Sequence, residues 1–172
     1  MSEISLLSTF FSYQAWANEE LLGSIGQLDP VRHGKECHVS IRLMNHSLVV
    51  GRIFAAHLTG QDHGFTADNT AETPSLAELR TAVIASDQWY LKYLEEITPD
   101  LLSQPLPFVF TDGDKGCMSR QEMLAHVVTH GGYHRGEIGQ LLAQLSITPP
   151  WDTFAVYLHR NEPSRRLAVA AE

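Results

Sequence analysis

Three histidines are spaced so that one helix could bring their rings together. Residues 126–138 read HVVTHGGYHRGEI and place His126, His130 and His134 at intervals of four. Each four-residue step turns a helix by about 400°, so the three rings lie along one stripe that drifts by only about 40° per step. Side chains at i and i+4 approach each other, and two inward-facing imidazoles on adjacent turns could therefore share one metal ion.

A further ligand is available on a second apolar segment. His46 lies in LMNHSLVVGRIF, beside Leu43 and Val49 on what would be an inward face. Helical bundles commonly build metal sites from facing helices, and His46 with His130 and His134 would make a three-histidine site. Three neutral ligands leave coordination positions open, which is typical of catalytic rather than structural metal sites.

The zinc-protease pattern HExxH carries its general base inside the motif, and neither HVVTH nor HGGYH contains that glutamate. Two other side chains are candidates for a catalytic role, His126 and Glu137. His126 could be a fourth ligand, a proton carrier or a core residue, and a role without metal contact is favoured. Glu137 could support a ligand histidine or form a salt bridge between helices, and the salt bridge is favoured. The remaining histidines are expected to be exposed to solvent: His33, His38, His57, His63 and His159.

Four segments with apolar residues at steps of three and four must position these side chains. The expected helices cover residues 4–25, residues 39–58, a segment that begins at TPSLAEL and closes at residues 98–100, and residues 119–145. Ser119 with Glu122 has the spacing of a capping box. Thr73 or Ser75 could cap the third helix, and Glu78 could complete a capping box there. Before the last helix, LPFVFTDGDKGCMS predicts a short hairpin or an ordinary loop.

This pattern predicts an all-α protein, an up-and-down four-helix bundle with one longer connection and a short irregular or hairpin excursion before the last long helix. We expect a single domain over residues 1–162, with a short packed segment near Phe154 and Tyr157, and a frayed tail over residues 163–172.

The formal net charge of −8 disfavours binding to nucleic acid and to anionic membrane surfaces. No apolar run is long enough to span a bilayer, and the first residues lack the features of a signal peptide. These properties predict a cytoplasmic protein in which Cys37 and Cys117 are free thiols, most simply as small semi-buried residues.

The sequence resembles the DinB-like family of metal-binding helical proteins over about residues 6–160. The segment YQAWANEELL is similar to the first-helix signature of that family, and HVVTHGGYHRGEI is similar to its last-helix motif. The resemblance implies a divalent metal ion, zinc or nickel, held by His46, His130 and His134. It also implies relatives that are transferases or isomerases dependent on small thiols such as bacillithiol or mycothiol, and it contributes to the expectation of a homodimer.

Two positions depart from the family pattern. The family usually has glutamine where this chain has Glu137, and it often has aspartate where this chain has Gly51. Gly131 and Gly132 each weaken a helix interior by about 1 kcal/mol relative to alanine. Their candidate roles are to admit a neighbouring helix or to let a ligand approach the backbone.

The sequence leaves the function open among three readings. The leading one is a metal-dependent enzyme that activates a small thiol, or water, for transfer to an electrophilic small molecule, with thiol S-transferase or hydrolase as the enzyme class. The alternatives are a metal-dependent hydrolase, which activates water, and a non-catalytic metal-binding dimer.

Overall fold

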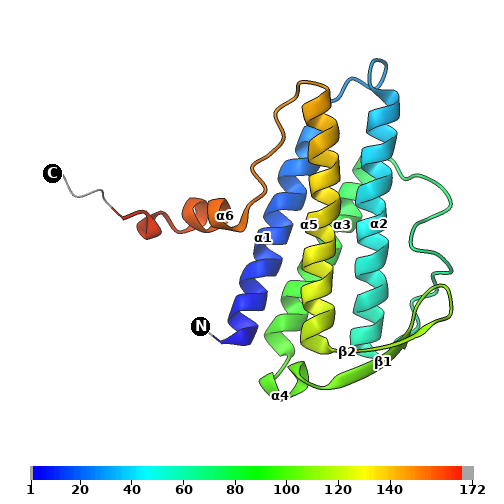
Figure 1. Cartoon of the computed structure of the whole chain (residues 1–172), viewed down its shortest axis with the longest axis vertical. Helices are drawn as coiled ribbons and strands as arrows, with labels where there is room; N and C mark the ends of the chain where they lie inside the picture. The colour runs from blue at the N-terminus through cyan, green and yellow to red at the C-terminus, as the bar shows by residue number, and fades with distance from the viewer. Residues whose placement is uncertain (1, 168–172) are drawn as a thin grey trace.

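Four long helices packed side by side make up most of the structure, a computed structural model that describes residues 2–167 (Figure 1). All four lie where the apolar periodicity predicts helices, and the second begins five residues earlier than expected, at Gly34 rather than Val39. The long helices are α1 (Glu3–Ile25), α2 (Gly34–Thr59), α3 (Leu76–Glu96) and α5 (Arg120–Gln144).

Both predicted capping boxes are confirmed. The hydroxyl of Ser75 accepts from the backbone N–H of Glu78, and the Glu78 carboxylate accepts from the backbone N–H of Ser75. Ser119 and Glu122 make the same reciprocal pair at the start of α5. These contacts satisfy N–H groups that have no partner inside a helix, and they therefore fix where α3 and α5 begin.

The sequence predicted helices that alternate in direction, and the structure differs from that prediction. Asn18 and Gln14 on α1 lie against Arg135 and Gly131 on α5, so these two helices run parallel. Figure 1 shows α1 and α5 rising while α2 and α3 both descend. The connection at residues 60–75 must therefore return along the length of the helices, which is why it is longer than the connections at residues 26–33 and 145–153.

A two-stranded hairpin precedes α5. The sequence predicted either a hairpin or an ordinary loop here. Strands β1 (Pro105–Val109) and β2 (Lys115–Ser119) pair antiparallel, with Phe108 opposite Gly116. The turn contains Gly113, whose φ of 95° favours glycine. The four-residue helix α4 (Pro99–Leu102) leads from α3 into this hairpin.

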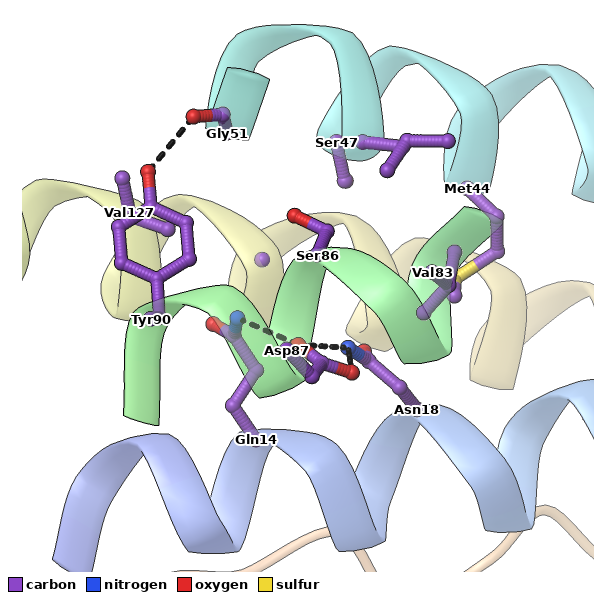
Figure 2. A pocket seen from close by; sticks show the side chains of 12 residues that line it. Gln14, Asn18, Met44, Ser47, Gly51, Val83, Ser86, Asp87, Tyr90 and Val127 are labelled. Atoms are coloured by element: carbon purple, nitrogen blue, oxygen red, sulfur yellow. Dashed lines mark hydrogen bonds between the residues drawn. The ribbon is translucent and has the colours of Figure 1, made fainter. Parts of the chain in front are cut away.

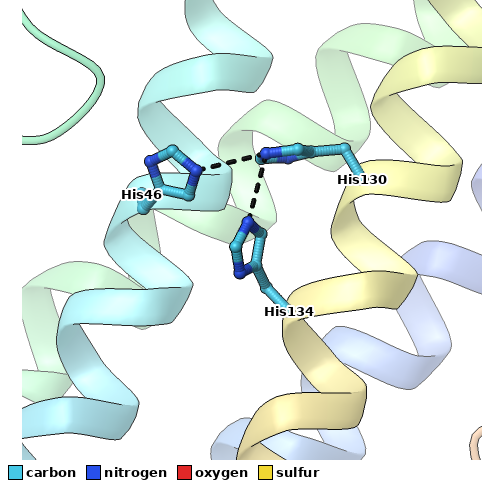
Figure 3. Close-up of side chains that lie close together, drawn as sticks. All are labelled: His46, His130 and His134. Carbon is cyan, nitrogen blue, oxygen red and sulfur yellow. Dashed lines mark hydrogen bonds between the residues drawn. The ribbon is translucent and has the colours of Figure 1, made fainter.

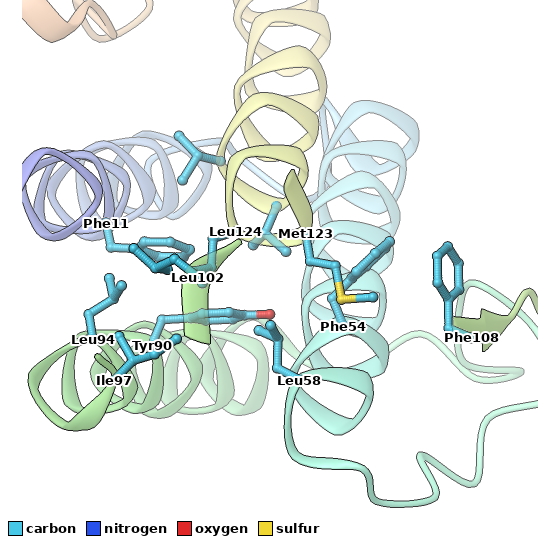
Figure 4. Close-up of a cluster of buried hydrophobic side chains, with 12 residues drawn as sticks. Phe11, Phe54, Leu58, Tyr90, Leu94, Ile97, Leu102, Phe108, Met123 and Leu124 are labelled. Atoms are coloured by element: carbon cyan, nitrogen blue, oxygen red, sulfur yellow. The ribbon is translucent and has the colours of Figure 1, made fainter. Parts of the chain in front are cut away.

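The core is divided into two apolar clusters along the helices. The cluster nearer the hairpin is rich in aromatic side chains, and Figure 4 shows Tyr90 of α3 lying among residues from α1, α2 and α5. Tyr90 stacks on Phe11 with ring centroids 4.6 Å apart, and its hydroxyl donates to the carbonyl of Gly51 at 2.6 Å. Burial raises the pKa of Tyr90, so this hydroxyl remains a donor.

We expect Tyr90→Phe to lower the free energy of unfolding by about 1 kcal/mol, the usual net contribution of one buried hydrogen bond. The ring and its stacking on Phe11 are retained, so the loss comes from the hydroxyl alone. Urea denaturation followed by circular dichroism measures it. Tyr133→Phe is the matched control, because Tyr133 is 66% exposed and should change stability by less than about 0.5 kcal/mol. Equal effects from both variants would contradict the assignment.

The chain ends in helix α6 (Phe154–Asn161) and the 3-10 turn η1 (Pro163–Arg165). The predicted packed segment is therefore a short helix, and η1 gives part of the expected frayed tail a regular structure, while residues 168–172 lie outside the described residues. Tyr13 and Trp16 of α1 are partly buried and pack against Tyr157 of α6. Cys117 is exposed rather than semi-buried, and Cys37 is partly buried. Among residues 2–167, no helix is long and apolar enough to cross a membrane.

Candidate metal centre

Three imidazole rings converge between α2 and α5. The Nε2 atom of His130 lies 3.2 Å from Nε2 of His46 and 3.2 Å from Nε2 of His134 (Figure 3). One ring nitrogen from each of the three residues lies within 4.8 Å of the others. The centroid of the His46 ring is 4.9 Å from that of His130 and 4.6 Å from that of His134. The structure thus brings together the three residues that the sequence proposed as ligands.

Hydrogen bonds on the far side of two rings fix which nitrogen carries the proton. Nδ1 of His46 lies 2.8 Å from the backbone carbonyl of Asp68, which can only accept. Nδ1 of His134 lies 2.6 Å from Oε2 of Glu137, a carboxylate that likewise accepts. In each neutral ring the proton therefore resides on Nδ1, and the Nε2 lone pair points toward His130.

The environment also keeps His130 neutral. Burial, followed by the neighbouring His134 and His46 rings, lowers the pKa of His130 to about 4. A neutral ring has at most one N–H at Nε2 and cannot donate linearly to two lone pairs.

The spacing of His130 Nε2 from the other two ring nitrogens fits a metal ion. Tetrahedral coordination with metal–nitrogen bonds of about 2.0–2.1 Å places ligand nitrogens about 3.3 Å apart. The two measured separations of 3.2 Å agree with that spacing. A cation accepts all three lone pairs at once, which no arrangement of imidazole protons achieves.

His126 lies one turn before His130 and outside the group of three. Its ring stacks on His130 with centroids 5.3 Å apart and contacts Phe54 at 4.7 Å. Burial lowers the pKa of His126, so the ring is neutral at neutral pH. Two histidines predicted to be exposed, His57 and His63, are partly buried and pack against each other with centroids 5.4 Å apart. His33 and His159 are also partly buried, and only His38 is exposed as expected.

Glu137 holds His134 in place instead of forming the predicted salt bridge between helices. The two residues are three positions apart on α5, so one helical turn sets their contact. This is the alternative considered less favoured from the sequence. Gly51, where the family often has aspartate, contributes its backbone carbonyl to Tyr90 and takes no part in the group of histidines.

A buried polar network lies behind the histidines. Nε of Arg135 donates to Asp152 at 2.6 Å, and Nη1 donates to Asn18 at 3.2 Å. Asn18 in turn donates to Asp87 at 3.0 Å, and burial raises the pKa of the Asp87 carboxyl. Tyr13 also donates to Asp152, and burial raises its pKa to about 12. Arg135 thus pairs with a carboxylate of the segment before α6 in the same chain.

A cavity of about 30 Å³ lies between the helices, beside this network (Figure 2). Gln14 and Asn18 of α1 reach across it to Asp87 of α3. Its volume suits a single water molecule. Gln14 Oε1 and Ser47 Oγ are buried without a hydrogen-bond partner among residues 2–167, and both residues line this cavity. Those two atoms are the groups that a buried water would satisfy.

Gly131 is the glycine of the HGGYH segment that the packing requires. A Cβ atom there would lie 3.1 Å from Oε1 of Gln14 and 3.2 Å from Nη1 of Arg135. A Cβ on Gly132 would meet only Arg135 Nη2, at an ordinary 3.8 Å. Of the two predicted roles, close packing of a neighbouring helix fits Gly131, where α1 contributes Gln14, and no such contact is found at Gly132 among the described residues.

Comparison with known proteins identifies the family of this chain. The model of the DinB family matches residues 1–166. Protein DinB of Bacillus subtilis (strain 168) is 23% identical over 170 residues, which cover 90% of this chain and 95% of that protein. No solved structure matched the chain. Because the family model spans nearly the whole sequence, the chain belongs to the DinB family.

Proposed function

We propose that this protein binds one divalent metal ion through His46, His130 and His134 and is an enzyme that activates a small thiol for transfer to an electrophilic small molecule. The observation that carries the proposal is the convergence of three Nε2 atoms, two of them with tautomers fixed by acceptors behind the ring. A zinc or nickel ion held there would favour the deprotonated form of a thiol, which is the nucleophilic form.

The surroundings of the three rings support catalysis over a purely structural role. The group contains three candidate ligands among the described residues, whereas structural zinc sites usually have four. A cavity of about 230 Å³ opens beside His46 and His130. Its lining also includes His126, a neutral ring that can accept a proton, so His126 is the better candidate for a general base. Glu137 is already engaged with His134 and serves to orient it.

Elemental analysis of protein purified without an affinity column tests metal binding, and about one zinc or nickel per chain is expected. A screen for thiol transfer then tests the reaction. Turnover that requires an added thiol supports the proposal, whereas turnover without a thiol would favour metal-dependent hydrolysis. Bound metal without turnover under either condition would favour the non-catalytic binding protein.

Glu137→Ala should weaken metal binding by about 10- to 100-fold, the usual effect of losing the partner that orients a ligand histidine. Glu137→Gln is the matched control, since its amide oxygen can accept the same Nδ1–H bond from His134 and should preserve most of the affinity. Competition with a chromophoric chelator measures both constants. Equal affinity of Glu137→Ala and the unmodified protein would show that the hydrogen bond to His134 does not matter for the metal.

The proposal also covers how the four long helices pack and whether two chains associate. The four long helices are proposed to form a four-helix bundle in which α2 and α3 are parallel. The homodimer remains a proposal, to be tested by analytical ultracentrifugation. Part of the apolar face of α1 is packed against α6 of the same chain and is therefore not available to a partner, since Phe10 contacts Phe154 with ring centroids 4.6 Å apart.

A further inference from the structure

The cavity beside the three histidines has a wall made largely of aromatic rings. Phe54 from α2 lies 5.9 Å from Phe108 of the hairpin, centroid to centroid, and 4.7 Å from His126 of α5. Phe108 in turn contacts Phe110, with centroids 4.8 Å apart. Figure 4 shows Phe54 and Phe108 near each other at the edge of the aromatic core cluster. The hairpin thus contributes a side of the cavity that the helices alone do not provide.

A glycine in the second strand makes this wall possible. Gly116 lies opposite Phe108 in the hairpin register. A Cβ atom on Gly116 would lie 2.6 Å from Cζ of Phe108 and 3.0 Å from Cε2 of Phe110. Both rings therefore rest directly on the backbone of β2, and a side chain at this position would displace them.

The charges around the cavity restrict what it can hold. Among the described residues, no lysine or arginine lines it, and the one formally charged side chain in the lining is the largely exposed carboxylate of Asp68. The aliphatic residues Val50 and Ile53 add to the apolar surface. A carboxylate or phosphate on the part of a ligand that points away from the metal would lose its hydration here without gaining a cationic partner.

We propose that this cavity binds the uncharged aromatic body of a small-molecule substrate, whose single metal-binding atom is directed at the group formed by His46, His130 and His134. The inference rests on the proposed function, because the proposed function supplies the metal ion that one end of the ligand faces. A dry apolar cavity of about 150 Å³ accommodates benzene. A volume of about 230 Å³ therefore admits one substituted ring. Small thiols with several charged or sugar groups do not suit this cavity.

Two probes that differ by one carboxylate test the proposal: phenylmethanethiol and 4-(mercaptomethyl)benzoate. Titration calorimetry on the zinc-loaded full chain should show the uncharged probe binding about 10-fold or more tightly than the carboxylated one, as expected for about 1.4 kcal/mol of lost hydration. Phe110 is 47% exposed, so Phe110→Ala should fold, and it should weaken phenylmethanethiol binding by about 3- to 10-fold. Trp151→Ala removes an aromatic side chain that is 71% exposed and outside the cavity lining, and it should leave the affinity unchanged.

Zinc content is measured on the same samples, which separates the two proposals. Full zinc occupancy with equal affinity for both probes, or with no effect of Phe110→Ala, would overturn the assignment of the cavity and leave the metal site intact. Failure to hold zinc at all would overturn the proposed function and this inference with it. Gly116→Ala provides a second check, since it should reduce phenylmethanethiol binding by displacing Phe108 while zinc content stays near one per chain.

Discussion

His130→Ala should abolish stoichiometric metal binding, with an expected loss of affinity of about 100-fold or more. His130 is the ring whose Nε2 lies 3.2 Å from both other candidate ligands, so its removal leaves two nitrogens with no third partner between them. Elemental analysis after equilibrium dialysis against zinc or nickel measures the loss. Circular dichroism verifies that the helices are retained.

His126→Ala is the matched control for this experiment. The two residues are one turn apart on α5 and their rings stack, but His126 lies outside the group of converging nitrogens. We expect His126→Ala to keep about one metal per chain, and to impair turnover if His126 is the general base. Metal binding by His130→Ala at full stoichiometry and unchanged affinity would refute the assignment of the ligands.

Arg135→Ala should lower the free energy of unfolding by about 3 kcal/mol, which is the low end of the range for breaking a buried ion pair by removing one partner. The Arg135 side chain is 2% exposed and that of Asp152 is 22% exposed, so the pair is largely shielded from water. Removal of the guanidinium leaves Asp152 without its cation and Asn18 with an unpaired carbonyl oxygen. Urea denaturation measures the change, and amide hydrogen exchange should show loss of protection around α6.

Arg165→Ala removes an arginine from an exposed pair with Glu162 and serves as the control, because an exposed pair contributes little to stability and its loss should leave the denaturation midpoint nearly unchanged. Arg135→Lys keeps a positive charge but not the fork of donors that reaches Asp152 and Asn18 together. It should therefore recover only part of the stability. Similar losses from Arg165→Ala and Arg135→Ala would show that burial of Arg135 has no special weight.

The helices could be predicted from the sequence because their signals are local. Apolar residues at steps of three and four mark the helical segments, and the Ser75 and Ser119 capping boxes mark two of their starts. The direction of α3 relative to α2 could not be predicted in this way, since it depends on the path of residues 60–75. That segment has no apolar period, and tertiary contacts determine its path, such as the two hydrogen bonds from the Asn45 amide to Asn69 and Thr70.

The sequence likewise predicts one part of the candidate site and not the other. His130 and His134 are four residues apart on one helix, so their proximity follows from helix geometry alone. The placement of His46 beside them required an assumption about which helices face each other. The carbonyl of Asp68 that orients His46 was missed, because a backbone atom in an irregular connection leaves no signal in the sequence. The pairing of Arg135 with Asp152 was missed for a related reason, since Asp152 lies in a segment without regular structure.

The separation of the three histidines along the chain bears on how the protein folds and unfolds. His46 and His130 are 84 positions apart, so an ion shared between them closes a large loop of the polypeptide. Closing such a loop costs chain entropy and is typical of contacts that form late, after local helices have appeared. The ion would then stabilise mainly the native state and have little effect on the folding transition state. Its removal should accelerate unfolding far more than it slows folding.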